Sequence, residues 1–116
     1  MTFEVELVVR ASGRVAVETL YHDGREPPAW NEQDARAVLT LMLIAIDRAA
    51  SGRADVARTV ALRGVSWIVT PFESGSAIAI EITAGSVIAG PFQIPERQLT
   101  ALITRAIEQD AEGRPS

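Results

Sequence analysis

Ten consecutive residues, 37–46, are apolar with the single exception of Thr40. A run of this length is about half of what a helix needs to cross a lipid bilayer, so it does not predict a membrane span. A helix that lies on a sheet in a monomer needs only one apolar stripe, whereas this run is apolar on almost every side. The fold must therefore cover this helix from more than one direction.

The helix that contains the run is predicted over residues 32–50. Asn31 is a good N-cap residue, because its side-chain oxygen can accept a hydrogen bond from the first turn. Trp30 occupies the position of a hydrophobic staple. Glu32 and Asp34 place negative charge at the positive end of the helix dipole. These signals fix the beginning of the helix.

Three residues of this helix lie outside the stripe that would face a sheet, namely Leu41, Leu43 and Ile44. The stripe itself consists of Ala35, Val38, Leu39, Met42, Ile46 and Ala49. A second helix could cover some of the three, and the rest would form an apolar patch, which soluble monomers avoid unless it binds something. Two interpretations stay open: an interface with a protein partner, most simply a two-fold homodimer, or complete burial within the chain.

Five segments have the composition of strands, and several alternate between apolar and polar residues. They are residues 3–10, 14–21, 59–72, 76–83 and 86 to 89 or 90. In the second segment Val15, Val17, Thr19 and Tyr21 share one face, and Gly64 could divide the third into two strands. The fourth carries Ile78, Ile80 and Ile82 on one face and is expected inside the sheet. Pro91 is expected at or beyond the end of the last strand, since proline has no N–H to donate.

Pro95 fits the first turn of a second helix that runs to about residue 109. The resulting order, β-β-α-β-β-β-α, predicts one α+β domain over residues 1–110. Such an order favours a single, mainly antiparallel sheet of about five strands with both helices on one face. Residues 111–116 are predicted to form a flexible tail.

In its order of elements the chain resembles the roadblock/dynein-light-chain and profilin-like folds with the leading helix missing. The likeness covers most of the chain and includes the hairpin Val-Arg-Ala-Ser-Gly-Arg-Val at residues 9–15. It implies the same layout, a sheet with helices packed against it.

Composition excludes several kinds of site. Cysteine and lysine are absent and His22 is the only histidine, so disulfides, thiolate metal sites and a multi-histidine metal site within one chain are excluded. A net charge of −4 without a run of basic residues argues against nucleic-acid binding, which depends on clustered cations.

The first residues do not have the pattern of a signal peptide. We expect a cytoplasmic protein, and the exclusive use of arginine is typical of a GC-rich bacterial genome.

No pattern predicts a catalytic centre, and no cofactor is expected. The glycines at residues 85 and 90 do not precede a helix, as a phosphate-binding loop would require. Residues 73–76, Glu-Ser-Gly-Ser, lack the flanking glycines of a nucleophile elbow. His22 precedes Asp23 in a loop and is interpreted as an exposed side chain rather than a catalytic base. The chain is therefore predicted not to be an enzyme.

Glu81 is a charged residue in the middle of a predicted strand. One interpretation places it on the solvated side of the sheet. The other makes it a buried or interfacial carboxylate paired with an arginine such as Arg63 or Arg10, because burial without a partner would be costly. Glu81 and Arg63 are the candidate polar site.

Two functional hypotheses follow. The first is a non-enzymatic protein-interaction module, homodimeric, with a regulatory or scaffolding role. The alternative is a domain that senses a small molecule or neutralises an effector protein. A sensor needs a pocket with convergent polar groups, whereas an inhibitor of the second kind needs a contiguous acidic surface, and the acidic residues here are scattered along the sequence.

Overall fold

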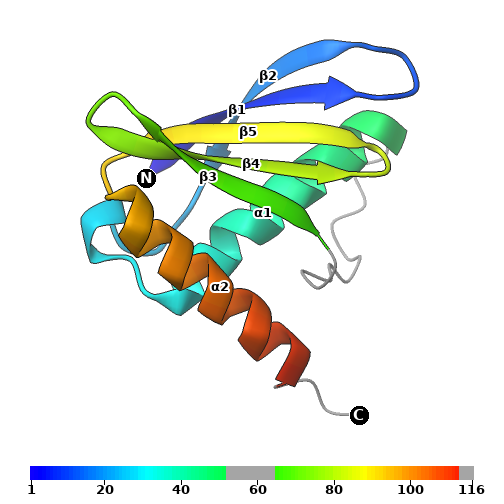
Figure 1. Ribbon diagram of the computed structural model, residues 1–116. Helices are drawn as coiled ribbons and strands as arrows, with labels where there is room; N and C mark the ends of the chain where they lie inside the picture. The colour runs from blue at the N-terminus through cyan, green and yellow to red at the C-terminus, as the bar shows by residue number, and fades with distance from the viewer. Residues whose placement is uncertain (52–64, 113–116) are drawn as a thin grey trace.

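A five-stranded antiparallel sheet with two helices on one side forms the computed structural model of the chain (Figure 1). The structure describes residues 1–51 and 65–112, with side chains up to residue 109. The strands are β1 (Thr2–Val9), β2 (Val15–Tyr21), β3 (Ser66–Phe72), β4 (Gly75–Ile82) and β5 (Gly85–Phe92). The helices are the short 3-10 turn η1 (Pro27–Ala29), α1 (Glu32–Ser51) and α2 (Glu96–Glu112). The predicted α+β layout is confirmed.

The strands lie in the order β2-β1-β5-β4-β3. The first and last strands are therefore neighbours, with Val5 opposite Ala89, and β5 occupies the middle of the sheet. β4 lies between β5 and β3, as the alternating isoleucines predicted. Ile78 and Ile80 are almost fully buried on the side of the helices.

The core lies between the sheet and the two helices. α1 packs against β1 and β5, whereas α2 packs against β3 and β4 and against α1 itself. Each strand buries alternate residues, because successive side chains point to opposite faces. The most buried residues of the sheet and the helices include Val5, Leu7, Val87, Val38, Met42, Ile46, Leu99 and Ile103.

β5 continues past Pro91 to Phe92, two residues beyond residue 90, the later of the two predicted ends of this strand. Ser76 pairs with Phe92 and Ile78 pairs with Ala89, so Gly90 and Pro91 together lie opposite a single residue of β4. This is a β-bulge, in which an extra residue is left out of the ladder. A proline fits there because its missing N–H has no ladder partner to lose.

Other predicted boundaries also differ. β3 begins at Ser66, and residues 52–64, which include Arg63 and Gly64, lie outside the described residues. α2 extends to Glu112, two residues into the segment predicted as a tail. The division into a domain over residues 1–110 and a tail stays a prediction. Within the part of the chain that the structure describes, no helix is long and apolar enough to cross a membrane.

Candidate functional site

The face of α1 predicted to form an interface is largely covered within the chain. Leu43 is only 5% exposed and lies near Trp67 and Ile107, so this residue is covered within the chain, as one of the two open interpretations allowed. α2 and β3 cover this side of the helix. Leu41 is half-buried against the core, and Ile44 is half-buried. An interface at these positions stays a prediction, but the described part of α1 carries no exposed large apolar side chain.

The exposed apolar side chains gather instead on the side of the sheet that no helix covers. Among the described residues, six large apolar side chains are between 46% and 64% exposed: Val15, Val17 and Tyr21 of β2, Ile68 and Phe72 of β3, and Ile88 of β5. We call the surface formed by these six residues, together with Glu4 and Glu6 of β1, the helix-free face.

The strand register places these residues on one surface. Val17 pairs with Glu6, and Glu6 pairs with Ile88. Ile88 pairs in turn with Ala79, and Ala79 with Ile68. These pairs form a row that crosses all five strands. Because residues paired across a ladder point to the same side of the sheet, the whole row lies on one face. The apolar side chains therefore form a band across the sheet, interrupted by one carboxylate.

Glu81 also points to the helix-free side, where it forms an ion pair with Arg10 at 2.9 Å. Its side chain is 66% exposed. Within one chain Glu81 is therefore solvated, as the first interpretation expected, and it is paired with Arg10, which the second interpretation named. An interfacial role for Glu81 stays a prediction. Arg63, the other half of the candidate polar site, lies outside the described residues. An exposed pair of this kind contributes little to stability.

A buried polar cluster at the beginning of α1 was not predicted. His22 is 3% exposed, which corrects its interpretation as an exposed loop residue, and its Nε2 lies 3.0 Å from Oδ1 of Asp34. The ring of His22 packs edge-on against Trp30, whose Nε1 donates to the carbonyl oxygen of Arg25. Asp34 and the aromatic rings thus hold the connection between β2 and α1 in place.

Asp34 accepts hydrogen bonds from several directions. The backbone N–H of Arg25 donates to Oδ1 at 3.2 Å, and that of Asn31 donates to Oδ2 at 3.0 Å. In return the backbone N–H of Asp34 donates to Oδ1 of Asn31, which confirms Asn31 as the N-cap and completes a reciprocal capping arrangement. A Cβ atom at Gly24 would lie 2.2 Å from Oδ1 of Asp34, so only glycine fits this close approach. The cluster is a structural anchor.

The anchor predicts a dependence of stability on pH. Burial alone raises the pKa of Asp34, but the hydrogen bonds from Asn31, Arg25 and His22 outweigh it and hold the pKa below its ordinary value. The carboxylate therefore stabilises the fold fully above the unfolded pKa of about 3.9. This contribution to the free energy of unfolding is lost as the pH falls below the unfolded pKa and through the lower pKa of the folded state.

Urea denaturation at a series of acidic pH values measures this loss. The native chain should lose more unfolding free energy over that range than Asp34→Asn, which has no carboxylate to protonate. Equal losses in the two proteins would contradict the assignment.

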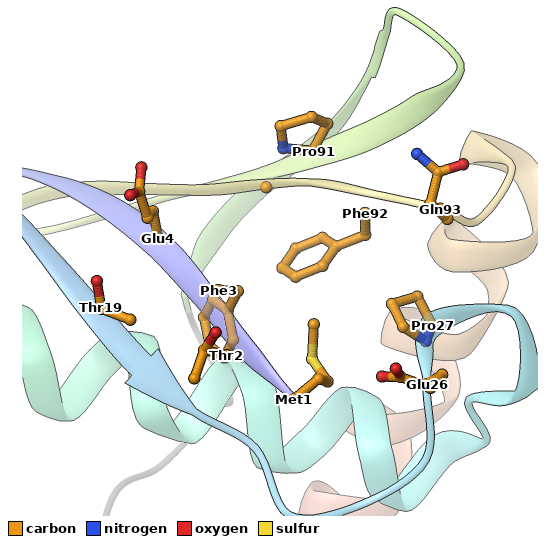
Figure 2. A pocket seen from close by; sticks show the side chains of 11 residues that line it. Met1, Thr2, Phe3, Glu4, Thr19, Glu26, Pro27, Pro91, Phe92 and Gln93 are labelled. Carbon is orange, nitrogen blue, oxygen red and sulfur yellow. The ribbon is translucent and has the colours of Figure 1, made fainter.

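A cleft of about 740 Å³ lies where β1 and β5 separate (Figure 2). The ladder between these strands ends at the pair of Val5 and Ala89, although both strands continue. Phe92 points into the cleft from β5, and Phe3 lies on the side of β1. Glu26 and Pro27 approach from the connection between β2 and α1 (Figure 2).

Comparison of the chain with models of protein families, with curated proteins and with solved structures gave no match. The resemblance in element order to the roadblock and profilin-like folds is therefore unsupported by these comparisons. Within residues 1–51 and 65–112, no group of three or more His, Asp or Glu side chains is placed to hold a metal ion.

Proposed function

We propose that this chain is a non-enzymatic protein-interaction module that forms a two-fold homodimer through its helix-free face and serves a regulatory or scaffolding role. One observation carries the proposal. Every large apolar side chain that is exposed in the described structure lies on this one face. Contiguous exposed apolar surface of this kind marks interaction sites in soluble proteins.

The size of the face fits a dimer. Five strands of seven or eight residues span about 24 Å across and about 25 Å along the strands. The projected area is roughly 600 Å², before the relief of the side chains is added. A standard interface buries about 800 Å² on each partner. Two sheets can pack face to face over this area as in a β-sandwich.

The pattern of the face favours a second copy as the partner. β5 is the central strand, and a two-fold axis parallel to it would place Ile88 against Ile88 of the second copy. The same axis would place Val17, on one edge strand, against Ile68 of the second copy, on the other. Glu6 would lie opposite the small Ala79 of the second copy, so Glu6 is the one charged position in this row. Apolar residues thus meet apolar residues in a self-complementary, isologous contact.

Sedimentation velocity at micromolar concentrations tests the dimer. The native chain should sediment as a dimer. Ile88→Glu should weaken association by at least about 100-fold, because it would place two unpaired carboxylates at the centre of the interface. Circular dichroism should show that the variant remains folded, since Ile88 is 46% exposed.

Ile44→Glu is the matched control, because it places the same charge on the half-buried face of α1. This variant should remain dimeric. A native monomer would contradict the proposal. So would the reverse result, in which Ile44→Glu dissociates the dimer and Ile88→Glu does not, because the interface would then lie on α1.

A further inference from the structure

The cleft between β1 and β5 combines an apolar floor with a polar rim. Phe3 and Phe92 are buried beneath it, with their ring centroids 5.5 Å apart. Pro27 and Pro91 form apolar walls on either side. The rim carries the hydroxyl groups and acidic side chains of Thr2, Thr19, Glu4 and Glu26 and the amide of Gln93. The cleft therefore offers apolar contacts and polar groups side by side, and small-molecule sites combine the two.

The charge of the rim is negative. Glu4 lies on β1, and Glu26 lies on the connection between β2 and α1, which forms the other side of the cleft (Figure 2). Neither carboxylate is hydrogen-bonded or ion-paired to another side chain of the described structure. No arginine is among the residues that line the cleft. The amino group of Met1 donates to the carbonyl oxygen of His22 at 2.7 Å and is engaged within the chain.

From this arrangement we infer that the cleft binds a small organic cation with an apolar body. The hydrocarbon part lies against Pro91, Pro27 and the edges of the two phenylalanine rings. The ammonium group lies at the rim, where Glu4 and Glu26 make the charge negative. An anion of the same shape would be repelled by both. All the residues that line the cleft belong to one chain, so we expect binding without a second copy, although Glu4 belongs to both the cleft and the helix-free face.

Calorimetric titration with 2-phenylethylammonium tests the inference, with 2-phenylethanol and phenylacetate as neutral and anionic compounds of similar shape. The ammonium compound should bind, and the other two should bind at least about tenfold more weakly. Heteronuclear NMR spectra of the same titration should show shifts at Thr2, Thr19 and Gln93. Equal binding of the alcohol, or no binding of the ammonium compound at millimolar concentration, would overturn the inference.

Charge-neutral variants locate the site. Glu4→Gln and Glu26→Gln should each weaken binding about two- to fivefold, as loss of an exposed ion pair does. Glu108→Gln, an exposed change on α2, should leave binding unchanged. Binding unaffected by either cleft variant would overturn the assignment.

The titration is repeated with Ile88→Glu to separate this site from the dimer. Retained affinity in that variant supports an independent site, whatever its oligomeric state. Loss of affinity there, with the fold intact, would overturn the independence of the site.

Discussion

Replacing Asp34 with alanine is expected to lower the free energy of unfolding by about 3–5 kcal/mol. The side chain is 95% buried and accepts hydrogen bonds from two backbone N–H groups, from Nε2 of His22 and from the guanidinium of Arg25. Alanine would leave the buried ring N–H of His22 and the half-buried backbone N–H of Asn31 without an acceptor. It would also remove the residue that ties the β2–α1 connection to the helix. Equilibrium urea denaturation near neutral pH measures the change.

Asp23→Ala provides the control for charge and composition. Asp23 is an exposed aspartate in the same connection, one residue from His22, and its removal should change stability by less than about 0.5 kcal/mol. Similar losses in the two variants would show that Asp34 acts only through net charge rather than through its buried contacts.

Replacing Phe92 with alanine is expected to cost about 3–5 kcal/mol, because a large side chain would leave a cavity in the core. Phe92 is 2% exposed and packs against two other aromatic rings. Its ring centroid lies 5.5 Å from that of Phe3 and 4.9 Å from that of Trp30. It therefore connects the end of the sheet to the beginning of α1. Thermal and urea denaturation both measure this loss.

Phe72→Ala is the matched variant for this experiment, since it removes the same side chain from a position that is 50% exposed. It should lower stability of the isolated subunit by less than about 1 kcal/mol. In the proposed dimer it should weaken association instead. A large loss of subunit stability in Phe72→Ala, or a small one in Phe92→Ala, would contradict the assignment of inner and outer faces.

The elements were predictable because their periodicities are strong. The alternation of Ile78 and Ile80 with alanines specifies a strand that buries one face, and Asn31 specifies the start of α1. The direction in which β2 faces was not predictable. Its two sets of residues, with Val17 on one side and Leu20 on the other, both contain apolar members. The register with β1 decides between them and turns the more apolar set away from the helices.

The anchor at Asp34 shows a different limit. A polar pair with the spacing of Asn31 and Asp34 is a local signal, and the sequence contained it. The contact with His22 depends on how the intervening loop folds back, and Gly24 is the only hint of such a close approach. The cleft was equally hidden, because it arises where β1 and β5 separate. That separation depends on the pairing of strands from opposite ends of the sequence, which periodicity does not reveal.

The place of β5 in the middle of the sheet has a consequence for the chain as it is synthesised. β1 and β2 are joined by a short loop and can pair once both are synthesised, but the inner edge of β1 has no partner until the fifth strand emerges. Until then a row of unpaired backbone donors and acceptors is open to any other extended chain, and such edges invite aggregation. Glu4 and Glu6 lie on β1 beside this seam, and we expect their charges to disfavour pairing with another copy before the sheet closes.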